Sequence, residues 1–184
     1  MKIIVLYIET GGLNSQEDGI CSISYKELGK EVVFTHYIKP CEHKFYSSKA
    51  LEINGLSLDK LENEGEDLFD VLDKFLSFLT SVSDGNKWNV KLLGQNLKFD
   101  LGFLETAFKE TMSSIFDFCH YHYKDTLFIA DYLKDIGKIN PRNLKLTTLY
   151  EYFFGKDILF KNAHTSEADV LMTERVYIEL LKIK

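Results

Sequence analysis

The order of apolar segments along the 184-residue chain limits the folds that it can adopt. Runs rich in β-branched and aromatic residues occupy positions 3–8, 20–25 and 32–38, and a fourth buried run follows at 90–93. Such short runs, bounded by turn residues like Gly29 and Lys30, are typical of strands. Three consecutive strands followed later by a fourth predict a mixed sheet whose first three strands form a meander.

Helical periodicity marks the remaining segments. Residues 67–82 place leucine and phenylalanine on one side of a helix, and three shorter helices are predicted at 100–109, 125–133 and 146–154. A final helix is expected after a cap at Thr165 or Ser166, because apolar residues recur there at every fourth position: Ala168, Met172, Val176 and Leu180. These elements predict an α/β fold, with helices beside the sheet, formed by a single domain over residues 1–184.

Composition is that of a globular enzyme or binding protein. Hydrophobic residues make up 45% of the chain and charged residues 27%. No apolar run approaches the roughly 20 residues that a transmembrane helix needs, and the apolar start is too short for a signal peptide. We therefore expect no membrane contact and a cytoplasmic location. The net charge of -6 argues against a protein that coats duplex DNA, but it allows an enzyme that holds a few nucleotides through metal ions.

The three cysteines are odd in number and far apart, so they do not form a disulfide framework. Two short segments, 41–43 and 119–122, together offer the cysteines and histidines of a zinc site. Their spacing is unusual for zinc, and scattered core and surface residues explain them better.

Three separate segments carry polar residues that suit a catalytic site. Tyr7 and Glu9 share one side of the first strand, because residues two apart in a strand face the same way. Asp100 lies where the fourth strand passes into a helix, and His164 and Asp169 lie at the start of the final helix. Taken alone, each segment also fits a plain structural explanation: a solvated strand end, a helix-capping acid and a surface histidine.

In this order and spacing the segments resemble the DEDDh (DnaQ-like) exonuclease superfamily, which includes bacterial proofreading subunits and ribonuclease T. The resemblance covers nearly the whole chain and rests on three main stretches and three minor ones: Leu6–Leu13, Gly94–Asp100 and His164–Asp169, then Ala50–Gly55, Asp125–Leu127 and Leu144–Leu149. It implies a ribonuclease-H-like fold and removal of nucleotides from the 3′ ends of single-stranded DNA or RNA.

The same resemblance implies roles for particular side chains. Glu9, Asp100 and Asp169 would hold Mg²⁺ or Mn²⁺, of which the family binds two ions, and His164 would activate water. Contacts with the terminal nucleotide fall to five further residues: Thr10, Gly12, Leu13, Asn96 and Phe99. The implied partners are a single-stranded 3′ end and a DNA polymerase subunit, and the choice between DNA and RNA stays open.

Tyr7 departs from the family pattern, which has Asp at this position. A phenol is neutral below a pKa near 10, so the metal cage lacks one negative charge, and the bulkier ring occupies an ion's place. We expect one ion instead of two, with impaired or altered activity; Glu17 and Asp18 are candidates for a displaced carboxylate. Gly11 and Gln95 are milder departures, where the family has Thr and His.

Two functions therefore compete. The first is a metal-dependent 3′–5′ exonuclease, and the second is a catalytically silent module that binds nucleic acid or a polymerase partner. Both predict that Glu9, Asp100, His164 and Asp169 converge in one open pocket at one end of the sheet. Release of mononucleotides from a labelled single strand would separate them.

Overall fold

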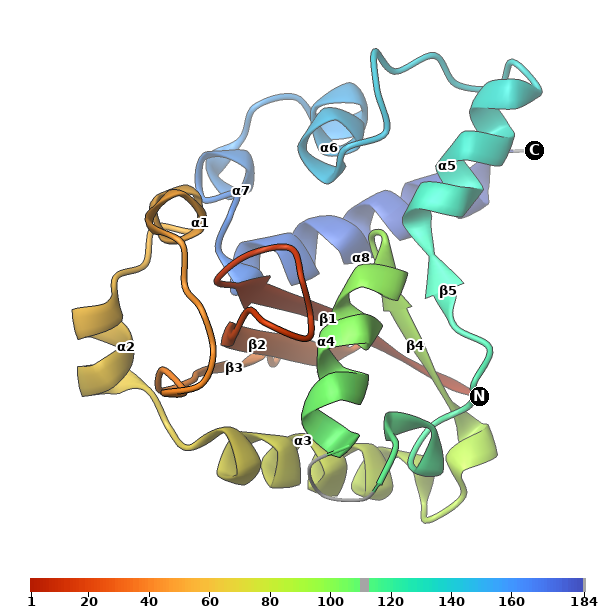
Figure 1. The fold of residues 1–184 in the computed structure, drawn as a ribbon. Coiled ribbons are helices and arrows are strands. Elements are labelled where there is room, and N and C mark those ends of the chain that lie inside the picture. The colour runs from red at the N-terminus through yellow and green to blue at the C-terminus, as the bar shows by residue number, and fades with distance from the viewer. Residues whose placement is uncertain (110–112, 184) are drawn as a thin grey trace.

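The computed structural model describes residues 1–109 and 113–183, which form a five-stranded sheet with helices on both faces (Figure 1). The strand order is β3-β2-β1-β4-β5. The strands are β1 (Lys2–Thr10), β2 (Ile20–Glu27), β3 (Phe34–Tyr37), β4 (Val90–Gly94) and β5 (Lys124–Asp125). The first three pair antiparallel, whereas β4 and β5 run parallel to β1. The predicted mixed sheet with an initial meander is confirmed.

Eight α-helices are described. They are α1 (Ser48–Ile53), α2 (Leu58–Glu64), α3 (Leu68–Ser83), α4 (Leu97–Lys109), α5 (Thr126–Asp135), α6 (Leu146–Phe154), α7 (Ile158–Lys161) and α8 (Ser166–Lys182). Short 3-10 turns lie at Lys87–Asn89 and Ile115–Asp117. Within the described ranges, no helix has the length and apolarity needed to cross a bilayer.

The central strand β1 supplies both halves of the core. Its even-numbered residues, such as Ile4 and Leu6, pack with α3 and α4, whereas Val5 packs with residues of α8 on the other face. This alternation is the period of two that a strand imposes. It places Tyr7 and Glu9 on the face of the sheet that α8 covers.

The C-terminal half of β1 extends past its neighbour β4. Parallel pairing with β4 covers only residues 2–5 of β1, whereas antiparallel pairing with β2 continues to Thr10, with a register shift after Glu9. The last residues of β1 therefore have an unpaired edge on the β4 side. This edge is where the candidate site forms.

Polar contacts attach α8 to the sheet. Lys26 of β2 forms a buried ion pair with Glu174, and the Gly29 amide donates to the same carboxylate at 2.6 Å. Nearer the start of α8, the Ser166 hydroxyl lies 3.0 Å from that of Ser22 and 2.8 Å from that of Ser24. Since Asp169 lies between these anchors, they fix its position against β1.

Several sequence-based boundaries need correction. The third strand runs from Phe34 to Tyr37 instead of from residue 32 to residue 38, because its pairing with β2 begins only where Phe34 lies opposite Tyr25. The helix predicted at 100–109 begins at Leu97, and the short helices α1, α2 and α7 were not predicted. Thr165 caps α8, and the four predicted apolar residues of that helix are buried.

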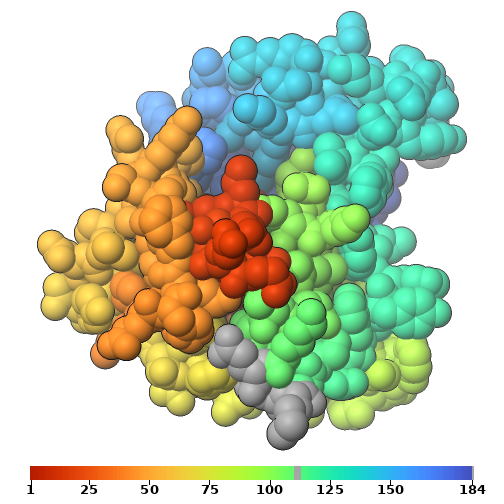
Figure 2. Space-filling view, in the orientation of Figure 1, coloured from red at the N-terminus to blue at the C-terminus, as the bar shows by residue number. Residues whose placement is uncertain are grey.

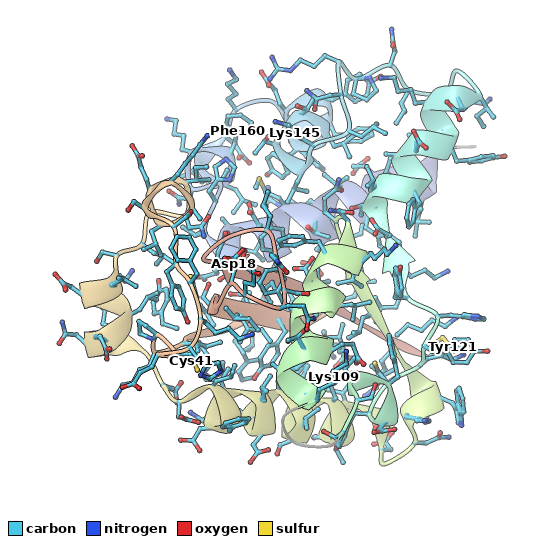
Figure 3. The ribbon with its side chains drawn as sticks, viewed as in Figure 1. Asp18, Cys41, Lys109, Tyr121, Lys145 and Phe160 are labelled. Carbon is cyan, nitrogen blue, oxygen red and sulfur yellow. The ribbon has the colours of Figure 1, made fainter. Side chains whose placement is uncertain are left out.

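The zinc alternative finds no support in this arrangement. Cys119 is buried in the core beside α3 and α4, and its thiol donates to the Ile115 carbonyl. Cys41, which Figure 3 labels, is a lining residue of a separate hollow that Thr106 and Ala107 of α4 also line. Among the described residues, no three His, Cys, Asp or Glu side chains gather as a ready-made metal site.

The buried ion pair gives a stability prediction. Glu174→Gln leaves the Lys26 charge buried without a counter-charge, since the two side chains are only 11% and 4% exposed. We expect the free energy of unfolding to fall by about 3–5 kcal/mol in urea titrations. The double variant Lys26→Met/Glu174→Met should recover most of that loss; an equal or larger loss in the double variant would contradict this explanation.

Candidate active site

All nine residues that the sequence predicted for the site line one pocket of about 830 Å³. They are Glu9, Thr10, Gly12, Leu13, Asn96, Phe99, Asp100, His164 and Asp169. On the surface, the segment after β1 emerges between the region around residue 50 and the region around residue 100, so segments far apart in sequence share this face (Figure 2). The predicted convergence is observed, and the individual roles remain predictions.

Glu9 supplies an unsatisfied acid at the end of β1. Its side chain is 7% exposed, and its Oε1 atom is buried without a hydrogen-bond partner among the described residues. A buried polar oxygen without a partner is costly, and such orphans usually mark a missing ion, water or ligand. Glu9 is therefore the side chain that most directly indicates a bound cation.

The turn after Glu9 is built around glycine. A Cβ on Gly11 would lie 2.7 Å from the Phe45 carbonyl oxygen, and one on Gly12 would lie 2.1 Å from the Asp18 carboxylate. This crowding explains why Gly11 replaces the larger residue of the family pattern. Asp18 also accepts the Asn14 amide at 2.8 Å.

The displaced carboxylate that the sequence led us to expect at Glu17 or Asp18 does not lie in the pocket. Neither Glu17 nor Asp18 lines the 830 Å³ pocket, and Asp18 is occupied in closing the turn after β1. The sequence hypothesis that one of them replaces the missing acid is wrong.

Asp100 reaches the unpaired edge of β1 from the first turn of α4. Its Oδ1 accepts the Ile8 amide at 3.0 Å, between the positions of Tyr7 and Glu9. The side chain is 3% exposed. The capping role expected of an acid at a helix start is thus replaced by a bond to the neighbouring strand.

The loop before α4 is held by Asp125, whose role the sequence indicated only through a short family-like segment. Its carboxylate accepts the amides of Asn96 at 2.9 Å and Leu97 at 2.8 Å while also capping α5. Asn96 is left-handed, with φ of 57°. Gln95 donates to the Leu144 carbonyl and accepts from Thr126, so both ends of its amide are engaged within the protein.

His164 also has a left-handed backbone, with φ of 71°, which is uncommon for any residue except glycine. Its amide donates to Asp169 Oδ1 at 3.3 Å, and its side chain is exposed beside the pocket. Strained backbone of this kind clusters at functional sites. Three non-glycine residues of the described chain have a positive φ, and two of them, Asn96 and His164, line this pocket.

Burial is the main reason that the pKa of each of the three carboxyl groups is raised. Burial, followed by the charges of Asp169 and Asp100, raises the pKa of Glu9 to about 9. Burial raises the pKa of Asp100 to about 8 despite its bond from Ile8, and that of Asp169 to about 6 despite the bond from His164. A cluster that resists ionisation in this way gains most when a cation neutralises it.

Tyr7 lies inside this acidic cluster. Burial, and then the nearby charges of Asp169, Glu9 and Asp100, raise its pKa well above the ordinary phenol value. Its hydroxyl donates a hydrogen bond to Asp169. The phenol thus stays neutral. It gives Asp169 a hydrogen-bond donor but adds no negative charge that could bind a metal.

The carboxylates of the pocket are chemically suited to a divalent cation, but there are few of them. Glu9, Asp100 and Asp169 offer the hard carboxylate oxygens that Mg²⁺ and Mn²⁺ take, and the orphaned Glu9 oxygen needs a partner. The described residues nevertheless hold no three acidic or imidazole groups already arranged around one point.

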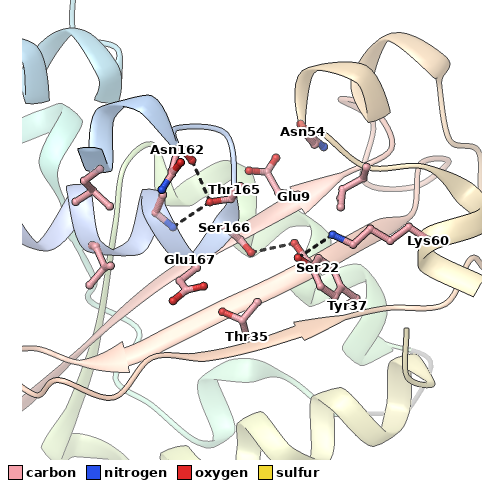
Figure 4. A pocket seen from close by; sticks show the side chains of 15 residues that line it. Glu9, Ser22, Thr35, Tyr37, Asn54, Lys60, Asn162, Thr165, Ser166 and Glu167 are labelled. Carbon is pink, nitrogen blue, oxygen red and sulfur yellow. Dashed lines mark hydrogen bonds between the residues drawn. The ribbon is translucent and has the colours of Figure 1, made fainter. Parts of the chain in front are cut away.

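Sequence reasoning missed several residues of the pocket wall. Asn54 donates to the Thr10 carbonyl at 3.0 Å, and Lys49 and Lys145 line the same pocket. Glu9 and Asn54 also border a second pocket of about 360 Å³ behind them, over the hydroxyls that anchor α8 (Figure 4). The family-like segments 50–55 and 144–149 were the available signal for these walls.

Comparisons with known proteins find similarity to a DNA polymerase III and to a DNA exonuclease. The chain is 28% identical over 182 residues, 97% of its length, to DNA polymerase III PolC-type of Bacillus subtilis (strain 168). It is 35% identical over 75 residues, 41% of its length, to the 3′-5′ DNA exonuclease Cap18 of Escherichia coli. The chain spans 11% and 39% of the lengths of these proteins. No family model matches.

Solved structures share the fold. Exonuclease I from Methylocaldum szegediense has a TM-score of 0.82 at 14% identity, covering 98% of this chain and 40% of that one. The zinc-bound complex of E. coli exonuclease I with single-stranded DNA has a TM-score of 0.79 at 19% identity, with the same coverage. At this identity the likeness establishes the fold alone.

The raised carboxyl pKa values predict how stability depends on pH. Without metal, folded Glu9 keeps its proton up to about pH 9, whereas the unfolded chain releases it near 4.5. The folded state thus binds more protons between these values, so its free energy of unfolding should fall as pH rises through that window. Urea titrations in EDTA from pH 5 to 9 measure the fall.

Glu9→Gln is the matched control, because it removes the titrating group and keeps the size. The stability advantage of the variant over the parent should grow as pH rises from 5 to 9. A constant or shrinking difference would contradict the raised pKa of Glu9.

Proposed function

We propose that the chain is a member of the DEDDh (DnaQ-like) 3′–5′ exonuclease superfamily and that it removes nucleotides from the 3′ end of a single strand, with activity lowered by Tyr7. The observation that carries this proposal is the pocket that gathers Glu9, Asp100, His164 and Asp169. DNA is the favoured substrate, since one relative is a DNA polymerase and the other a DNA exonuclease.

In this mechanism Glu9 and Asp169 would hold a divalent cation, Mg²⁺ or Mn²⁺, and Asp100 would contribute a further carboxylate. The cation would supply charge stabilisation for the phosphoryl oxygens. His164, exposed at the pocket edge, accepts the proton of the attacking water. The apolar side chains of Leu13 and Phe99 contact the terminal base; Leu13, 87% exposed, is free to do so.

The backbone around the terminal nucleotide completes the proposed contacts. Thr10 and Gly12 form a tight turn, in which the Thr10 hydroxyl donates to the Gly12 carbonyl at 2.6 Å. Asn96 presents its side chain from a loop that Asp125 holds in place. A turn and loop fixed in this way keep the 3′ end in one orientation, which favours reaction over free encounter.

Tyr7 is the reason to expect weak activity. It donates a hydrogen bond to Asp169 where the family resemblance places a metal-binding acid, so the second ion lacks a ligand. With one ion, the protein loses part of the charge stabilisation that a two-ion site gives to the transition state.

The second candidate function is a silent module that binds a single strand or a polymerase partner. The position of Tyr7 within the carboxylate cluster favours the silent module, because the phenol donates to Asp169 where a cation would otherwise bind. The similarity to a DNA polymerase III supports both a polymerase partner and a cytoplasmic location, which stay predictions.

The deciding experiment is release of mononucleotides from a 3′-labelled single strand in Mg²⁺ or Mn²⁺. We expect slow, metal-dependent release by the parent chain and none by Asp169→Asn, since the already depleted cage then loses a further carboxylate. Metal-stimulated release by Asp169→Asn at the parent rate would show that the activity arises elsewhere. No release by the parent would favour the silent module.

Tyr7→Asp should raise exonuclease activity by at least about a hundredfold. It restores an acid on Glu9's side of β1, and a second ion is worth several kcal/mol of charge stabilisation, with each ~1.4 kcal/mol worth tenfold in rate. The measurement is the initial rate of single-strand degradation across a Mg²⁺ titration.

Tyr7→Phe is the matched control, because it removes only the hydroxyl that donates to Asp169. It should not reproduce the gain of Tyr7→Asp. A rate for Tyr7→Asp no higher than the parent's at saturating Mg²⁺ would mean that Tyr7 is not the limiting defect.

A further inference from the structure

Two lysines border a pocket whose buried groups are acidic. Lys49 belongs to α1, and Lys145 directly precedes α6; both line the 830 Å³ pocket that contains Glu9, Asp100 and Asp169. Both lysines are exposed, whereas the three carboxylates are at most 7% exposed. The pocket therefore has an acidic floor and a basic edge (Figure 3 labels Lys145).

Neither ammonium group has a polar partner among the described residues. Elsewhere, lysines such as Lys26 and Lys74 form ion pairs, but Lys49 and Lys145 have no side-chain hydrogen bond or ion pair to any described residue. Charges left free at a pocket edge are available to a ligand.

The two lysine charges matter because the groups at the base of the pocket are acidic. A phosphodiester strand is an anion, and the floor of the pocket offers it three carboxyl groups and no positive charge, so the floor alone does not attract a strand. Lysine ammonium groups contact phosphates without reading the base, and such contacts fix the position of a strand. The overall charge of -6 makes local positive charge more important.

We propose that Lys49 and Lys145 form a phosphate-binding edge that holds the backbone of a single strand upstream of its 3′-terminal nucleotide. This inference rests on the proposed substrate, a single-stranded 3′ end, and extends it to the path of the strand. The terminal phosphate goes to the carboxylate floor through the cation, and the next phosphates meet the two lysines at the solvent side. The strand thus enters past α1 and the start of α6.

The test is the binding of a 5′-fluorescein-labelled octathymidylate, dT8, measured by anisotropy from 50 to 200 mM salt with Ca²⁺ present. For Lys49→Gln/Lys145→Gln we expect Kd to rise about tenfold at 50 mM salt. The slope of log K against log salt should become shallower by about 1.4, because each lost contact with a single strand removes about 0.7. Lys49→Arg/Lys145→Arg should keep the slope of the parent.

Lys30→Gln is the matched control for loss of charge. Lys30 is exposed and lies after β2, whose final residue Glu27 pairs with Ile4 near the start of β1, away from the pocket. It should leave Kd and slope within about twofold of the parent. Competition by the mononucleotide dTMP should be equal in the parent and in Lys49→Gln/Lys145→Gln, because dTMP has no upstream phosphate.

The outcomes separate this inference from the proposed function. An unchanged Kd and slope in the double glutamine variant, an equal loss in Lys30→Gln, or an equal loss of dTMP binding would overturn the phosphate-binding edge. Failure of the parent to bind dT8 would overturn it as well. A parent that binds dT8 through the lysines but releases no mononucleotide in Mg²⁺ would keep this inference and remove the exonuclease proposal.

Discussion

The hydrogen bond from the Ile8 amide to Asp100 is the constraint on which the site depends. Because β4 pairs with only residues 2–5 of β1, the end of β1 would leave a buried amide without a partner, at a cost of about 1–3 kcal/mol. Asp100 supplies that partner from α4. The bond brings the second acidic segment against the first and fixes Asp100 between Tyr7 and Glu9.

The other parts of the site hold α4 and α8 in the positions that this bond requires. Asp125 accepts the amides of the loop before α4, which lets Asn96 adopt its left-handed backbone. On the other face, the serine contacts and the ion pair of Glu174 hold α8 against β2, so Asp169 meets Tyr7 and Glu9. The result is a pocket in which three buried carboxyl groups and the Tyr7 phenol lie close together.

Sequence patterns predicted the elements that bury long apolar faces and missed those that do not. The alternation in β1 and the four-residue repeat of α8 predicted the strand and the helix that carry Glu9 and Asp169, because burial orients such elements. The family resemblance was needed to assign the two acids to one site. The short helices α1 and α7 bury few side chains, so no period revealed them. Lys49 and Lys145 were missed as site residues, and Asp125 was noted only within a family-like segment, because their importance comes from neighbours that only the folded chain brings together.

The most direct test of the account is a count of metal ions in a crystal grown with Mn²⁺ and dTMP, using anomalous diffraction at the manganese edge. The account predicts one manganese peak, shared by Glu9 and Asp169, with the Tyr7 hydroxyl still bonded to Asp169. Absence of manganese from the pocket would contradict the cation site. Two well-occupied peaks would contradict the explanation that Tyr7 excludes the second ion.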